Sequence, residues 1–181
     1  DITNPVYSGG PEDLTPYRYE NQDYQTRSVF LTQNLSFYDR FVVSAGVRND
    51  SMDLSSEGES YGAAFDDSDD FSETTVRGAL TYIVNDELST YVSYVESVAP
   101  PTIGVTPERG KQQEIGLKYS PDGMNAQFSA AIYNLERDDV TIAVVQDNGA
   151  IDQQTIGTSR ARGLDLEAKA ELTDNLSIVG G

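Results

Sequence analysis

The side chains that could carry chemistry in this chain are carboxylates and aromatic rings, because the sequence contains no histidine and no cysteine. Thiol nucleophiles, histidine-based triads and zinc sites of the Cys/His type are therefore excluded. Neighbouring acids such as Asp138 and Asp139 could in principle do general acid–base work, but no feature of the sequence supplies a pocket or raises a carboxylate pKa. We expect no catalytic residue, no enzyme activity and no cofactor.

A run of acids, Asp66-Asp67-Ser68-Asp69-Asp70, offers hard oxygen ligands of the kind that calcium prefers. The run lacks the Asp-x-Asp-x-Asp-Gly register and the distal glutamate of a specific calcium loop. Calcium binding stays an alternative, and we assign no metal ligand.

Aromatic side chains in polar segments are candidate ligand-binding residues, because a flat ring can pack against a flat ligand. They are Tyr17, Tyr19 and Tyr24 in the opening segment and Tyr61, Phe65 and Phe71 in a long acidic segment. Loop aromatics often pack against their own loop instead, so this assignment is a hypothesis.

These side chains must be positioned by strands, because short turn signals alternate with long polar segments along the chain. The turn signals are Asp39-Arg40, Asn85-Asp86-Glu87, Pro121-Asp122-Gly123 and Thr173-Asp174-Asn175. The long polar segments, read as loops, are 53–72, 99–108 and 137–158. Predicted strands are 27–38, 41–53, 73–84, 88–98, 109–120, 124–136 and 159–172, with 175–181 opening the next. Short turns at one end and long loops at the other are typical of an outer-membrane β-barrel.

Alternation within the strands separates a polar from an apolar face. The polar set, expected to face a wet lumen and to pair charges across neighbouring strands, is Gln112, Glu114, Lys118, Asp165, Glu167 and Lys169. The apolar set, expected to face lipid, includes Ile115, Leu117, Leu164 and Leu166. An interfacial aromatic girdle is predicted from Tyr24, Tyr38, Tyr82, Tyr91, Tyr94, Tyr119 and Tyr133. A soluble β-sandwich has the same alternation, but its strands usually run about 5 to 6 residues, shorter than those predicted here.

Charge and hydropathy narrow the class of protein further. The formal net charge of −18 argues against nucleic acid or anionic lipid as the main partner. The sequence holds no apolar run near the ~20 residues of a transmembrane helix and no signal peptide at Asp1. We therefore expect a mature or excised chain that ends within a strand.

Several segments resemble the barrel of TonB-dependent ferric-siderophore receptors. Residues 107–118 (PERGKQQEIGLK) are similar to the family's Pro-Glu-x-Gly-x-Gln-x-Glu-x-Gly-x-Lys strand, and residues 160–167 (RARGLDLE) to its Arg-x-Arg-Gly-hydrophobic-Glu-x-Glu strand, with Asp165 at the first acid. Weaker similarities lie at 28–33, 46–50 and 88–98, the last ending in Val98 rather than an aromatic residue. The resemblances follow the family's order along the chain.

The resemblance implies an all-β antiparallel meander of long strands, part of a barrel of about 22 strands filled by a plug. Residues 1–181 would form part of that barrel, without the plug, the TonB-contacting segment or the closing strand. The implied function is energised import of ferric siderophores across the bacterial outer membrane, with the siderophore, the TonB complex and outer-membrane lipid as partners. The alternative is an acidic β-sheet adhesion or scaffold module, soluble or surface-displayed, with a possible calcium site.

Overall fold

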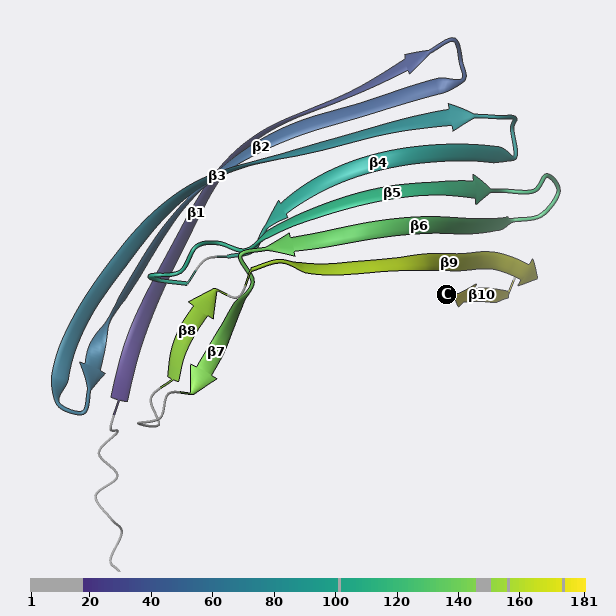
Figure 1. Ribbon diagram of the computed structural model, residues 1–181. Coiled ribbons are helices and arrows are strands. Elements are labelled where there is room, and N and C mark those ends of the chain that lie inside the picture. Colours follow the sequence, from purple (N-terminus) through teal and green to yellow (C-terminus); the bar gives the residue numbers. More distant parts are fainter. Residues whose placement is uncertain (1–17, 101, 146–150, 156, 174) are drawn as a thin grey trace, which may run out of the picture.

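A computed structural model describes residues 18–100, 102–145, 151–155, 157–173 and 175–181. Its main feature is one curved antiparallel sheet of eight strands in the order β1-β2-β3-β4-β5-β6-β9-β10 (Figure 1). The strands are β1 (Arg18–Phe37), β2 (Phe41–Ser60), β3 (Ala63–Ile83), β4 (Leu88–Val98), β5 (Arg109–Tyr119), β6 (Ala126–Asp138), β9 (Ser159–Thr173) and β10 (Leu176–Gly180). A separate hairpin pairs β7 (Thr141–Val145) with β8 (Ile151–Thr155). Each strand of the main sheet therefore pairs with its neighbour in the sequence, apart from the step from β6 to β9.

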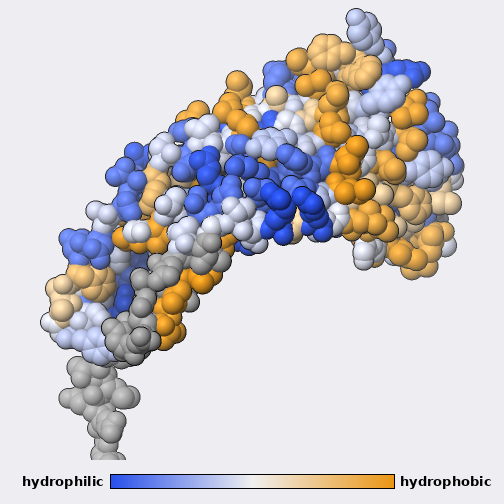
Figure 2. Space-filling model, viewed as in Figure 1, coloured by the Kyte–Doolittle hydropathy of each residue, from blue (hydrophilic) through white to orange (hydrophobic). Residues whose placement is uncertain are grey.

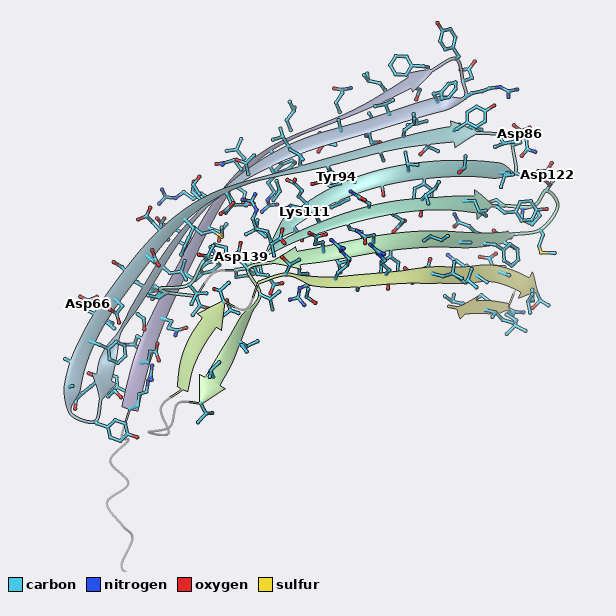
Figure 3. All side chains as sticks on the ribbon, in the orientation of Figure 1. Asp66, Asp86, Tyr94, Lys111, Asp122 and Asp139 are labelled. Carbon is cyan, nitrogen blue, oxygen red and sulfur yellow. The ribbon has the colours of Figure 1, made fainter. Side chains whose placement is uncertain are left out.

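The predicted short turns lie together at one end of the sheet. Asp86 and Asp122 mark two of these turns, whereas Asp66 and Asp139 lie at the other end (Figure 3). The predicted hairpin through Pro121-Asp122-Gly123 is confirmed, because β5 pairs antiparallel with β6, and Gly123 supplies a positive φ of 75°.

Of the three segments predicted to be loops, 53–72 and 137–158 contain strands, so these two predictions are wrong. Segment 53–72 is not a loop, because β2 and β3 continue through it in unbroken register and reverse at Tyr61 and Gly62, which have φ of 50° and 80°. Segment 137–158 contains the β7–β8 hairpin. In the outer halves of β2 and β3 polar residues predominate on both faces, so little alternation reveals these strands in the sequence. β7 is a run of only five residues, TIAVV, within an otherwise polar segment. Only 99–108 contains no strand among its described residues.

The apolar side chains lie on a surface of the sheet rather than in a core. Among the described residues only Met52, Ala126 and Ala131 are buried hydrophobics, while Ile132 and Leu164 are 62% and 60% exposed. Figure 2 shows such residues gathered over the half of the sheet nearest the short turns. A protein in water could not leave this much apolar surface uncovered.

The register arranges this apolar face in rungs across β4, β5, β6 and β9. Starting from the long-loop end, the rungs are Glu96–Lys111–Glu136–Arg160, then Tyr94–Gln113–Asn134–Arg162, then Val92–Ile115–Ile132–Leu164, then Thr90–Leu117–Ala130–Leu166, and last Leu88–Tyr119–Phe128–Ala168. The order is charged, polar, aliphatic, aliphatic and aromatic. This is the sequence of environments that a barrel wall meets from the headgroup region through the hydrocarbon to the opposite interface.

The apolar band slants across the sheet. The register places Arg162 on β9 and Gln33 on β1 in the same rung. On β9 the apolar band ends at the cation Arg162. On β1 the cation on this face is Arg27, which lies six residues further from the short turns than Gln33. Six residues of strand span about 20 Å and six strand-to-strand steps about 29 Å, which gives a slope of about 35°. Strands of outer-membrane barrels tilt by about 35 to 45°. The slant therefore follows from a flat membrane crossing tilted strands.

Part of the predicted aromatic girdle has the expected place. Tyr82 and Tyr119 lie on the apolar face near the short turns, where their rings contact Phe41 and Phe128 at centroid distances of 5.0 Å and 6.3 Å. For Tyr24, Tyr91 and Tyr133 the girdle assignment is wrong, because these three residues lie on the face opposite the aliphatic rungs. Tyr94 stays on the apolar face, in the polar rung beside Gln113.

Glycines explain the placement of Tyr91 and Tyr133. A Cβ atom at Gly116 would lie 2.7 Å from the Tyr91 ring, and one at Gly163 would lie 2.6 Å from the Tyr133 hydroxyl. Each ring therefore covers the backbone of the neighbouring strand where only glycine fits.

Among the described residues, no helix is long and apolar enough to cross a membrane.

Candidate ligand-binding site

The polar face of the sheet carries the six residues predicted to line a lumen. The register places Gln112, Glu114 and Lys118 on β5 and Asp165, Glu167 and Lys169 on β9 on one face, opposite the aliphatic rungs. On β3 the same face carries Asp69, whose carboxylate accepts a hydrogen bond of 3.0 Å from the backbone N–H of Gly104. Gly104 belongs to segment 99–108, which lies on the concave side of the bent β1–β3 strands (Figure 1). That these six face a water-filled lumen stays a prediction.

On this polar face, called the wall below, several side-chain contacts involve Tyr91. Its hydroxyl donates to a Glu114 carboxylate oxygen, the Gln112 amide donates to the other oxygen at 3.0 Å, and the Lys118 ammonium lies 5.6 Å from the centre of the Tyr91 ring. The expected charge pairing is absent, since no salt bridge joins the six predicted wall residues, all of which lie in described strands. The ion pairs of the described residues lie instead toward the long-loop ends of the strands, as in Lys111–Asp138 at 2.9 Å. The acidic and basic side chains among these six residues are therefore not paired with one another.

A pocket of about 520 Å³ lies between the outer parts of β1, β2 and β3 and the segment that follows β4. Its lining includes Arg18, Glu20, Gln22, Tyr24, Leu54, Ser56, Phe65, Asp67, Thr102 and Ile103. The volume falls within the range of small-molecule sites, and the mixture of aromatic rings with a few charged groups is typical of them. We treat this pocket, called the outer pocket below, as the candidate ligand-binding site.

A hydrogen-bonded carboxylate organises one side of the outer pocket. Glu20 accepts hydrogen bonds from the buried Ser56 hydroxyl at 2.6 Å, from the Gln22 amide at 2.7 Å and from Arg18 at 2.6 Å. These donors, with Ser56 the largest contributor, lower the pKa of Glu20 to about 2. The Arg18 guanidinium also lies 5.5 Å from the centre of the Phe65 ring. Glu20 is therefore ionised at any physiological pH and holds Arg18 over the aromatic wall.

The structure brings together two of the six predicted binding aromatics. Tyr24 and Phe65 both line the outer pocket, and Phe71 lies on the same face of β3, next to buried Met52 in the register. Tyr19 lies on the other face of β1, and Tyr61 lies in the turn at the tip of the β2–β3 hairpin. Tyr17 lies outside the described residues. The assignment of any of these residues to a ligand stays a prediction.

Sequence reasoning missed the polar half of the outer pocket. Arg18, Glu20 and Gln22 precede the first predicted strand, which starts at residue 27, whereas β1 begins at Arg18. The sequence holds no signal that could have revealed them, because residues 18–24 (RYENQDY) are polar on both faces apart from one tyrosine on each. Ile103 comes from a segment whose position only the fold supplies.

The acidic run at 66–70 does not assemble a metal site. Among the described residues, no group of three or more acidic side chains is placed so that it could hold a metal ion. The reason is geometric, because successive residues of β3 point to opposite faces of the sheet and Asp66 and Asp67 are therefore separated.

Comparison with known proteins identifies the class. The family model for the TonB-dependent receptor-like β-barrel matches residues 1–181, the whole chain. The chain belongs to this family of receptor barrels. Barrels of this family lie in the bacterial outer membrane, and the exposed aliphatic rungs are the surface that such a location requires. The alternative of a soluble or surface-displayed adhesion module is therefore wrong.

Particular relatives bring the comparison closer. The chain is 32% identical over 176 residues to the ferrichrome outer membrane transporter/phage receptor of Escherichia coli K12, covering 94% of this chain and 23% of that protein. It is 28% identical over 184 residues to the ferrioxamine B receptor of Salmonella typhimurium, covering 98% of this chain and 25% of that protein. The chain thus spans about a quarter of the length of each of these two relatives.

Solved structures show the same fold at lower identity. The ferric-catecholate import receptor Fiu of E. coli K12 matches with a TM-score of 0.70 and 15% identity, over 86% of this chain and 26% of that one. The alcaligin outer membrane receptor FauA of Bordetella pertussis matches with a TM-score of 0.68 and 19% identity, over 88% of this chain and 29% of that one. The sheet is thus an arc of a receptor barrel.

Proposed function

We propose that the protein containing this chain imports ferric siderophores through the outer membrane with energy supplied by TonB, and that residues 1–181 form part of its barrel wall. The observation that carries the proposal is the outer pocket, which combines two aromatic rings with hydrogen-bonding groups at the end of the sheet away from the short turns. The relatives, which are named for ferrioxamine B and ferrichrome, support a ferric chelate of this kind as the ligand.

The chemistry of the pocket suits a chelate whose iron is already coordinated. The aromatic and hydrogen-bonding groups that line the pocket suit contacts with the organic shell of the chelate. Tyr24 and Phe65 would pack against the apolar part of the shell, and Arg18, held by Glu20, would donate to its oxygens. Contacts from other parts of the whole receptor would complete the site.

The test titrates ferrioxamine B and ferrichrome against the full-length protein by calorimetry and measures growth on each chelate under iron limitation. Replacing both Tyr24 and Phe65 by alanine should weaken binding at least tenfold, since each ring supplies about 1 kcal/mol or more of apolar contact. Tyr19→Ala is the matched control, because Tyr19 is on the same strand but on its other face. Failure of the full-length protein to bind or grow on any ferric chelate would overturn the proposal, whereas equal losses in both variants would remove only the pocket from it.

A further inference from the structure

The outer half of β3 has a neighbouring strand on one side only. Its register with β2 is unbroken as far as Ala63, whereas its pairing with β4 ends at Arg77. Figure 1 shows β3 bending away from β4 in this part of the sheet. Residues 63–73 therefore have β2 as their single strand neighbour within the part of the chain that the structure describes. We call their other side the free edge.

The free edge presents backbone groups that lack hydrogen-bond partners. Along an antiparallel strand, alternate residues direct their N–H and C=O groups to the same side. The Val76 N–H donates to the Glu96 carboxylate of β4 at 3.1 Å, so Val76 and every second residue before it point away from β2. On the free edge these residues are Ala64, Asp66, Ser68, Asp70 and Ser72. Of their N–H and C=O groups, the Asp70 N–H alone has a partner among the described residues, the Asp69 carboxylate at 3.2 Å.

The free edge carries none of the devices that usually stop another strand from pairing. Natural sheets protect an exposed edge with a proline, a bulge or a lysine. Residues 63–73 contain no proline, no lysine and no arginine, and their register with β2 shows no bulge. From Ala64 to Ser72 the strand is about 27 Å long, so its outward groups could form a ladder with an extended peptide of about nine residues.

Acidic side chains beside the free edge face other acids across the sheet. On the face that continues the aliphatic rungs, Asp66 lies opposite Glu57, and Asp70 lies opposite Asp53. Figure 3 shows Asp66 on this half of β3, at the end of the sheet away from the short turns. None of these four acids forms a salt bridge with a described residue. Like charges directly opposite each other destabilise a sheet, and cations on an added strand would relieve this repulsion.

The free edge lies in water, beyond the apolar band. Ser72 lies in one rung with Arg27, the cation beyond the apolar residues of β1. From that rung the edge runs away from the short turns. Because short turns are periplasmic in barrels of this kind, the free edge is extracellular.

We propose that the free edge binds an extended, basic peptide segment from outside the cell as an added β-strand. The unpaired backbone groups supply the ladder, and lysine or arginine side chains opposite Asp66 and Asp70, four residues apart on the added strand, supply the charge pairs. A second copy of this chain does not fit, because pairing two free edges would bring acids against acids. The acids therefore select the partner by the sign of its charge.

The test uses the full-length protein in detergent and a capped nine-residue peptide of alternating lysine and threonine that begins and ends with lysine. Calorimetry measures its affinity, and hydrogen exchange followed by mass spectrometry reports on the amides of 64–72. The peptide should bind and slow exchange in this segment at least tenfold, since its backbone would bond the outward N–H groups. The same peptide with every amide N-methylated keeps its charge but cannot form a ladder, and it should not slow the exchange.

Two protein variants separate the ladder from the charge. Ser68→Pro removes an outward N–H and leaves the bonds to β2, and it should weaken binding at least tenfold. D66N/D70N should weaken binding about tenfold at low salt, through the loss of two exposed charge pairs. The matched control D86N/D122N makes the same change of charge at the short turns and should bind like the parent. Circular dichroism and heat-dependent gel mobility check that each variant is folded.

Four results would overturn the proposal. Slow exchange of 64–72 in the full-length protein without peptide would show that another part of the receptor already covers the free edge. Equal binding of the N-methylated peptide would leave only a charge attraction. Unchanged affinity in folded D66N/D70N would remove the role of the acids, and an equal loss in D86N/D122N would make it unspecific. The comparison of the two peptides needs no variant, so it stands even where Ser68→Pro does not fold.

Discussion

Replacing Leu166 by arginine should destabilise the protein by an amount set by its depth in the membrane. On the apolar face of β9 the residues between Arg162 and the end of the strand are Leu164, Leu166, Ala168, Ala170 and Leu172. Ala168 is the middle of this series, so Leu166 lies about 6.6 Å along the strand, or about 5 Å in depth, from the midplane. An arginine costs about 2 to 4 kcal/mol at the midplane and about 0 to 1 kcal/mol near the interface. We therefore expect a loss of about 2 kcal/mol for Leu166→Arg.

The assay is guanidinium unfolding of the full-length protein in phospholipid vesicles, followed by far-ultraviolet circular dichroism. Two controls separate depth from charge. Leu172→Arg lies about 10 Å from the midplane and should cost about 1 kcal/mol or less. Ser129→Arg introduces the same side chain on the opposite face, where Ser129 is paired with Glu167, and should be close to neutral. Equal losses for Leu166→Arg and Ser129→Arg, or no loss for either, would refute the assignment of the faces.

Two further predictions concern packing and acidity. Gly163→Val should destabilise the protein by about 1 to 3 kcal/mol in the same unfolding assay, because its Cβ would lie within 2.7 Å of the Tyr133 ring. The control Gly78→Val should be nearly neutral, because its Cβ would meet no atom nearer than 3.9 Å. Similar effects of the two substitutions would contradict the close approach of Tyr133 to Gly163. The lowered pKa of Glu20 means that its bonds stabilise the outer strands above the pKa of an unfolded glutamate, near 4.5, and that this stabilisation is lost as the pH falls toward 2. Digestion by pepsin between pH 5 and 2 should therefore cleave the outer part of β1 increasingly at low pH, and Ser56→Ala should move that onset to higher pH; an unmoved onset would show that the Ser56 hydroxyl does not hold Glu20 ionised.

The sequence by itself determined the meander, the short turns and the two faces. Alternation at 109–118 and 159–172 is strong, because each of these strands has one apolar and one polar face, and a slip of one residue would exchange them. The Pro-Asp-Gly turn fixed the β5–β6 hairpin, since it restricts the backbone locally. The turn depends on residues that are adjacent in the chain, and each face of a strand keeps one kind of surroundings along its length. Both features can therefore be predicted from the sequence without coordinates.

Only the tertiary structure decided the parts beyond the membrane. Strands with water on both faces carry no alternation of hydropathy, so the outer halves of β2 and β3 read as an acidic loop although their pairing is continuous. The outer pocket joins Glu20 on β1, Ser56 on β2 and Ile103 after β4. The neighbours of Tyr91 and Arg162 on the adjoining strands likewise depend on cross-strand register, which is a property of the folded sheet.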